Sequence, residues 1–166
     1  MYNWTHKKWC RPSDPINIVF EGISLDEVEK FLLGQGWQPA SFLFAFASSH
    51  VIPDPDPINK RPQDRQLIKP IKFKKIPKIK KILKRLHIRL WDIGNKIIAG
   101  IHIDALRVPG HSPTDFESVE KFFAEDCKQN SNWEVLEDAE DLDNRIAGHG
   151  QPYNNGKATI IRRRVQ

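Results

Sequence analysis

The chain has 166 residues and a net charge of +5, and 39% of its residues are hydrophobic. This length predicts one domain of ordinary size, and nine Phe with five Trp exclude a disordered chain, which lacks the apolar surface to offset its ordering entropy. No run approaches the roughly 20 apolar residues that span a bilayer, and the N-terminal residues lack the features of a signal peptide. We therefore expect a cytoplasmic protein that meets a membrane only at its periphery.

The charges are unevenly distributed along the chain. The segment Lys69–Arg85 has nine basic and no acidic residues, whereas Glu134–Asp143 has six acidic and no basic residues. This asymmetry favours contact with a polyanion, either a phospholipid surface or a nucleic acid. A solvated basic flank is an equally good interpretation. The residues expected to meet an anionic surface are Lys72, Lys74, Lys75, Lys78, Lys80, Lys81 and Lys84.

The clearest local signals lie near the start of the chain. The alternation of apolar and other residues over Ile16–Glu21 predicts a first strand. Ser24 followed by Glu27 forms a capping box, so a helix is expected to begin there. Gly34 and Gly36 are suited to end that helix.

The middle of the sequence is less regular. We expect residues 1–13 to form an N-terminal tail and residues 14–166 a single domain. Within it, residues 39–85 are predicted to be an irregular insertion, first proline-rich and then basic, because repeated prolines exclude regular helix and interior strand. The sequence does not decide whether the basic part, residues 69–85, is helix, strand or loop.

The most informative segment is a predicted hairpin. Two apolar-rich runs flank Gly94-Asn95, a pair suited to a two-residue turn with positive φ. If the turn is tight, paired residue numbers sum to 189. The pairs expected on one side are Arg85 with Asp104, His87 with His102, Arg89 with Gly100, and Trp91 with Ile98. The other side is apolar on both strands, at Leu86, Ile88, Leu90, Ala99, Ile101 and Ile103. We expect this side to form core and the polar side to carry chemistry or face solvent.

The remaining elements complete a recognisable order. Ser112 is expected to cap a second helix that has Pro113 at its first position. Short strands are expected over Trp133–Leu136 and Ala158–Val165. The order strand, helix, hairpin, helix, strand predicts an α+β fold, a ferredoxin-like βαββαβ sandwich whose antiparallel sheet has two helices on one face, with an additional C-terminal strand.

Seven segments occur in a fixed order over nearly all of residues 14–162: DPINIVFEG, QGW, KRPQD, HIRLW, AGIHID, DFESVEKFFAED and GQPYNNGKATII. This ordered set resembles the LssY C-terminal domain family. The resemblance implies association with bacterial membranes, because that domain is commonly fused behind a membrane enzyme of the phosphatidic-acid phosphatase type, sometimes with a DedA-like portion. It implies such a phosphatase or an anionic membrane surface as partner, and it assigns no reaction to the domain itself.

The polar side of the hairpin is the best candidate site, and three interpretations of it stay open. His87, His102 and Asp104 could bind one divalent metal, with His111 on the next loop as a further ligand. The same imidazoles with Arg89 could instead bind a phosphate-bearing or acidic ligand, and Gly100 would leave room for it. In the third interpretation the polar side is structural, with a cross-strand ion pair and stacked histidines.

A second candidate lies in the segment KRPQD. Arg61, Gln63 and Asp64 would complete a charged pocket if this loop folds over the polar side of the hairpin. By itself such a segment is usually a turn in which the Asp side chain bonds nearby backbone N–H groups.

Catalytic motifs are missing from the sequence. It contains no phosphate-cradling P-loop, no HExxH and no G-x-S-x-G, and neither Cys10 nor Cys127 has an activating context. These observations favour a non-catalytic accessory or ligand-sensing domain linked to membrane lipid-phosphate metabolism, which binds a phosphate-bearing or acidic ligand. No cofactor is expected, and a divalent metal stays open as an alternative. The alternatives are a small metal-dependent phosphoesterase and a nucleic-acid-binding module, although the HIRLW strand lacks the aromatic pair of an RNA-recognition motif.

The basic segment predicts binding to anionic vesicles at low salt. Each lysine near an anionic bilayer contributes about 1 kcal/mol, and this attraction is screened as ionic strength rises. In vesicle co-sedimentation we expect binding to anionic vesicles that fades with added salt, and none to neutral vesicles. Equal binding to both vesicle types would disprove the electrostatic interpretation, and preferential binding to RNA would support the nucleic-acid alternative.

Overall fold

The structure, a computed structural model, describes residues 4–6, 12–40, 51–52, 61–62, 65–70, 84–106, 111–142 and 154–165. The helices are α1 (Leu25–Gly34) and α3 (Glu117–Lys128). The strands are β1 (Trp4–His6), β2 (Pro12–Pro15), β3 (Ile18–Glu21), β4 (Gln38–Pro39), β5 (Val51–Ile52), β6 (Arg61–Pro62), β7 (Arg65–Pro70), β8 (Lys84–Asp92), β9 (Lys96–Leu106), β10 (His111–Asp115), β11 (Trp133–Asp141) and β12 (Lys157–Arg163).

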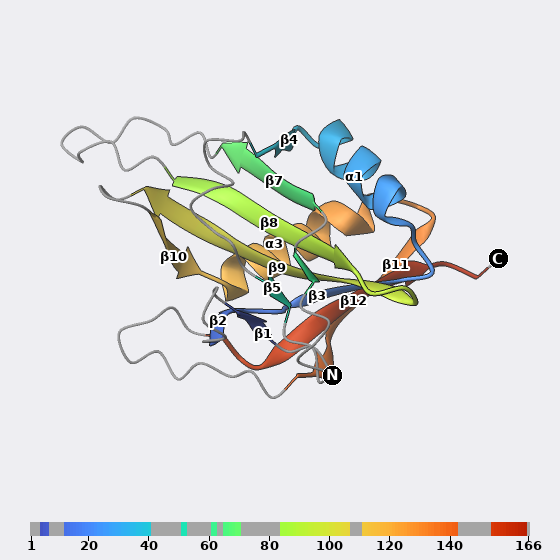
Figure 1. Cartoon of the computed structure of the whole chain (residues 1–166). Helices are drawn as coiled ribbons and strands as arrows, with labels where there is room; N and C mark the ends of the chain where they lie inside the picture. The colour runs from blue at the N-terminus through green and yellow to red at the C-terminus, as the bar shows by residue number, and fades with distance from the viewer. Residues whose placement is uncertain are drawn as a thin grey trace.

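An eight-stranded sheet is the centre of the fold (Figure 1). Seven strands follow the order β11-β12-β3-β9-β8-β7-β4, and β10 also pairs with β9. A separate four-stranded sheet has the order β2-β1-β5-β6. The predicted α+β class is confirmed. The predicted ferredoxin-like antiparallel sheet is not, because the C-terminal strand β12 lies between β11 and β3 and runs parallel to β3.

Both helices cover the same face of the large sheet, as predicted (Figure 1). Val28 and Leu32 of α1 and Phe123 of α3 belong to one buried apolar cluster with Ile88 of β8 and Phe20 of β3. Burial of each such side chain contributes about 1.5–3 kcal/mol to folding. This cluster is the main core, and it lies on the apolar side of the β8–β9 hairpin.

The two helix starts illustrate one correct and one wrong prediction. Ser24 Oγ accepts the Glu27 N–H at 3.3 Å, so the predicted cap of α1 is confirmed. The second helix does not begin at Ser112, because residues 111–115 form β10 and pair with β9. Asp115 Oδ1 accepts the Ser118 N–H at 3.1 Å instead. The chain therefore stays extended beside β9 as far as Asp115, and α3 begins only after this pairing ends.

Several strands lie in segments where the prolines and acidic residues did not predict them. The insertion expected to be irregular contains β7, which pairs with β8 and buries Leu67. The expected N-terminal tail contributes β1 and β2. The strand expected to end at Leu136 continues to Asp141, with a break in its register before Glu140 and a positive φ of 52° at Asp138. An edge strand such as β11 tolerates acidic side chains because one of its sides faces no neighbour. Most of the basic segment, residues 71–83, lies outside the described residues.

The side chain of Asn17 makes two hydrogen bonds to the backbone of Ile101 in β9, as a neighbouring strand would do. Its Nδ2 donates to the Ile101 carbonyl at 3.0 Å, and its Oδ1 accepts the Ile101 N–H at 2.9 Å. The Asn17 backbone also bridges neighbouring strands, donating to Ala99 and accepting from Thr159. Asn17 is fully buried, so these bonds satisfy polar groups that water cannot reach.

Replacing Asn17 by Ala is therefore expected to destabilise the domain by about 2–4 kcal/mol, because Ile101 would keep a buried donor and acceptor without partners. Urea unfolding of both proteins measures the difference. Asn132→Ala, at an exposed position, is the matched control and should change the free energy of unfolding by less than about 0.5 kcal/mol. A similarly small effect of Asn17→Ala would show that the Asn17 bridge does not hold the sheet.

Candidate functional site

The β8–β9 hairpin has the predicted register. His87 pairs with His102, Arg89 with Gly100, and all nine pairs sum to 189. The turn closes with the Ile93 N–H on the Lys96 carbonyl at 3.0 Å. Gly94 has a φ of 97°, whereas Asn95 has no positive φ, which is the pattern of a type II′ turn.

The polar side of this hairpin, which was expected to carry chemistry or to face solvent, is buried. His87 and Asp104 are 0% exposed, Arg89 and His102 are 1% exposed, and Arg85 is 7% exposed. The apolar side is also buried, as predicted, with Ile103 only partly so. A strand pair with two buried sides needs polar partners for every polar group on them.

Asp104 is the hub of this buried polar centre. Its carboxylate accepts from Nε and Nη2 of Arg85 at 3.4 and 3.2 Å. The Oδ2 atom lies 3.2 Å from Nδ1 of His87, and Oδ1 lies 3.0 Å from Nε2 of His102. The cross-strand ion pair predicted from the register thus exists, and the same carboxylate also meets both imidazoles.

The two imidazoles meet each other as well. Nδ1 of His87 lies 3.3 Å from Nε2 of His102, and their rings are nearly perpendicular. On its far side, Nε2 of His87 contacts the amide of Gln66. Among the described residues, Nδ1 of His102 has no hydrogen-bond partner. The His102 ring also packs edge-on against Phe116, directly before α3.

Gln66 was missed in the sequence because its strand was missed. It lies on β7, opposite Arg89, within the stretch expected to be irregular. The available signal was the apolar pair Leu67-Ile68, which the flanking prolines obscured.

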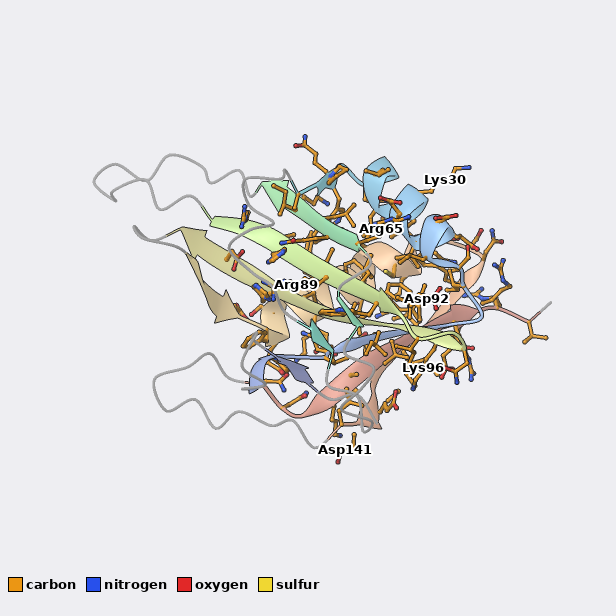
Figure 2. The ribbon with its side chains drawn as sticks, viewed as in Figure 1. Lys30, Arg65, Arg89, Asp92, Lys96 and Asp141 are labelled. Atoms are coloured by element: carbon orange, nitrogen blue, oxygen red, sulfur yellow. The ribbon has the colours of Figure 1, made fainter. Side chains whose placement is uncertain are left out.

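Burial sets the charge of His87. Removal from water holds the pKa of His87 well below its usual range, and the nearby positive charge of Arg89 lowers it further. The hydrogen bond to Asp104 opposes these effects without cancelling them. His87 is therefore a neutral imidazole at pH 7. Figure 2 shows Arg89 over the central strands of the large sheet.

The other predicted site residues are not brought to this centre by any described contact. Arg61 lies in β6 and His111 in β10, but their side chains are outside the described part of the chain. Gln63 and Asp64 lie outside the described residues, as do most lysines of the predicted anionic-surface set, namely Lys72, Lys74, Lys75, Lys78, Lys80 and Lys81. The backbone of Lys84 begins β8.

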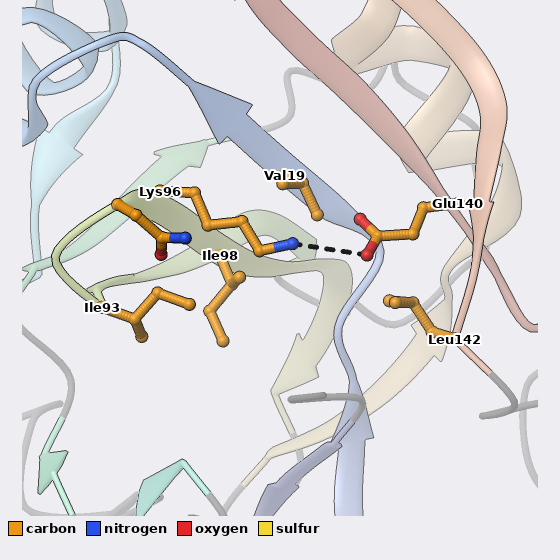
Figure 3. A pocket seen from close by; sticks show the side chains of 7 residues that line it. Val19, Ile93, Lys96, Ile98, Glu140 and Leu142 are labelled. Carbon is orange, nitrogen blue, oxygen red and sulfur yellow. Dashed lines mark hydrogen bonds and ion pairs between the residues drawn. The ribbon is translucent and has the colours of Figure 1, made fainter.

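A cavity of about 350 Å³ lies at the turn end of the hairpin, away from the polar centre (Figure 3). Its wall is mostly apolar, from Val19, Ile93, Ile98 and Leu142. Across it Lys96 Nζ and Glu140 Oε1 form an ion pair at 3.3 Å. None of the predicted site residues lines this cavity.

Comparisons with family models, curated proteins and solved structures found no match to this chain. The resemblance to the LssY C-terminal domain therefore stays a prediction from the sequence. Within the described residues, neither helix has the length and apolar character to cross a bilayer.

A second buried ionisable group lies on the helix side of the sheet. Glu120 of α3 is 4% exposed, and its Oε1 accepts from the Thr159 hydroxyl at 2.8 Å. Among the described residues its Oε2 has no hydrogen-bond partner. Burial raises the pKa of Glu120 to about 8, helped by the negative charges of Glu117 and Asp138. Glu120 is thus mostly protonated at pH 7.

This burial predicts a pH-dependent stability. Between about pH 4.5 and pH 8 the folded state keeps a proton on Glu120 that the unfolded state releases, so stability falls as the pH rises through this range. Glu120→Gln removes the ionisation and keeps the shape. We expect it to match wild type at pH 4 and to be more stable by on the order of 2–4 kcal/mol at pH 9.

Chemical denaturation across this pH range measures the effect. Glu125→Gln, on the exposed side of α3, is the matched control and should show no such pH-dependent gain. A Glu120→Gln effect of the same size at pH 4 and pH 9 would mean that Glu120 does not change its protonation in this range.

Proposed function

We propose that this chain is a non-catalytic accessory domain that binds a small charged ligand at the buried polar centre and serves membrane lipid-phosphate metabolism. The observation that carries binding rather than turnover is the burial of the centre. Catalysis requires that substrate reach the reacting atoms, and His87, His102 and Asp104 are at most 1% exposed. A closed centre fits an ion or a small group held in place better than a substrate that must enter and leave.

The cysteine among the described residues, Cys127, also fits a binding role. Burial raises the pKa of the Cys127 thiol, so it carries no thiolate at neutral pH. Cys127 is free and belongs to the buried face of α3, within the apolar core. The small metal-dependent phosphoesterase, the first alternative from the sequence, would need an opening to the polar centre.

The charge of the ligand can be argued from the donors. A phosphate-bearing or acidic ligand is supported by Arg89, which lies next to the histidine pair and opposite Gly100. The Asp104 carboxylate already occupies the position between the two imidazoles, however, and repels an anion there. The imidazole nitrogens and the carboxylate oxygens are also metal-ligand atoms, so this donor set can hold a cation at the histidine end of the polar side.

The cellular setting is proposed from the sequence. The segments that resemble the LssY C-terminal domain support a partner of the phosphatidic-acid phosphatase type. The lysines of residues 69–85 support contact with an anionic membrane surface on the cytoplasmic side. The alternative of nucleic-acid binding rests on the same lysines.

Binding without turnover predicts that the purified chain hydrolyses no phosphate ester. Assays with a chromogenic phosphomonoester, glycerol phosphate and phosphatidate, each with Mg²⁺, Mn²⁺ or Zn²⁺, should give no more phosphate than an Asp104→Asn variant. Metal-dependent hydrolysis that this variant loses would replace the proposal with the phosphoesterase alternative.

A further inference from the structure

Three potential metal-ligand atoms converge in the polar centre. We infer that the ligand of this centre is a divalent transition-metal ion, held by Nδ1 of His87, Nε2 of His102 and the carboxylate of Asp104. The inference rests on the proposed binding function and names its ligand. All three side chains are buried, and their ligand atoms lie within 4.8 Å of one another.

The separations of these atoms match a coordination shell. Nδ1 of His87 and Nε2 of His102 are 3.3 Å apart, and each lies 3.2 or 3.0 Å from an oxygen of Asp104. A tetrahedral ion with bonds of about 2.0–2.1 Å holds its ligand atoms about 3.3 Å apart. The two nitrogens, and each nitrogen with its nearest Asp104 oxygen, therefore have the spacing that such a shell requires. The two nearest oxygens are the two different oxygens of this carboxylate. A water or a further group would complete the shell.

The donor types select the kind of ion. Two imidazole nitrogens with one carboxylate suit Zn²⁺, Fe²⁺ or Ni²⁺. Mg²⁺ and Ca²⁺ prefer shells made of oxygen atoms, which this centre does not provide among its described residues.

The surroundings orient these ligands from outside. Gln66 contacts the imidazole nitrogen of His87 that points away from the centre. With the amide oxygen turned toward that nitrogen, Gln66 would accept its N–H and fix Nδ1 as the metal ligand. Arg85 holds the Asp104 carboxylate in place at 3.2 Å. Removal of such an outer partner typically weakens metal binding 10- to 100-fold.

The competing interpretation is a hydrogen-bond network without an ion. In it, both imidazoles donate to the Asp104 carboxylate, and Gln66 donates to Nε2 of His87. This network needs no metal, and the conformation of the centre would not respond to one. The two interpretations differ in metal content and in the effect of chelators.

The test uses the full chain, purified without chelators, dialysed, and analysed for metals before and after incubation with Zn²⁺, Fe²⁺, Ni²⁺ or Mg²⁺. We expect about one equivalent of a transition metal, none of Mg²⁺, and a lower melting temperature after chelation. Loading with Co²⁺ should give the visible absorption of a tetrahedral site with nitrogen and oxygen ligands. His102→Ala should lose this metal, and Glu140→Gln, an acid outside the centre, should keep it.

A variant that keeps all three metal ligands distinguishes loss of metal binding from loss of the fold. Gln66→Ala should remain folded and bind the metal 10- to 100-fold more weakly in competition with a chromophoric chelator. Wild type without bound metal after Zn²⁺ loading, or His102→Ala with unchanged metal content, would overturn the inference. If the metal-free protein is stabilised by inorganic phosphate, the metal inference fails and the proposed binding function stands. If the protein hydrolyses phosphate esters, the proposed non-catalytic function fails and the metal inference stands.

Discussion

The single register between β8 and β9 is the constraint on which the rest of the molecule depends. A slip of β8 by one residue would exchange the two sides of that strand. Arg89 and His87 would then face α1 and α3, and Ile88 would face the polar side. The buried polar groups on both sides would then lack hydrogen-bond partners. The helices offer mainly apolar surface to His87 and Arg89, and the remaining groups of the polar centre would have lost these two residues. The Gly94 turn, the core and the polar centre therefore stabilise the same pairing.

Burying the polar side of this hairpin has an energetic consequence. An isolated charge in a dry interior costs several kcal/mol, and Asp104 avoids that cost by meeting Arg85 and both imidazoles. Asn in place of Asp104 would keep one acceptor oxygen, but it would remove the counter-charge of Arg85 and turn the other acceptor into a donor. The centre is therefore organised as a unit, and its members cannot be understood as separate cross-strand pairs.

The sequence predicts the local features of this fold and misses those that depend on distant segments. Gly94-Asn95 fixes the hairpin register, and Ser24 fixes the start of α1, because both signals act within a few residues. The burial of His87 could not be predicted, since it depends on strands such as β7 that the prolines obscured. Ser112 was misplaced for a similar reason: β9 extends to Leu106 and pairs with β10, and that pairing overrides a favourable capping residue.

Strand β9 connects the polar centre to the rest of the domain. It pairs with β8 from Ile97 to Ala105, with β3 near the turn and with β10 at its far end. His102 and Asp104 lie on its far half, and the His102 ring contacts Phe116 at the start of α3. Any ligand that fixes these two side chains would hold β9 to β8 and limit the movement of the segment that leads into α3. Its binding energy would then appear as stability of the central strands and of α3.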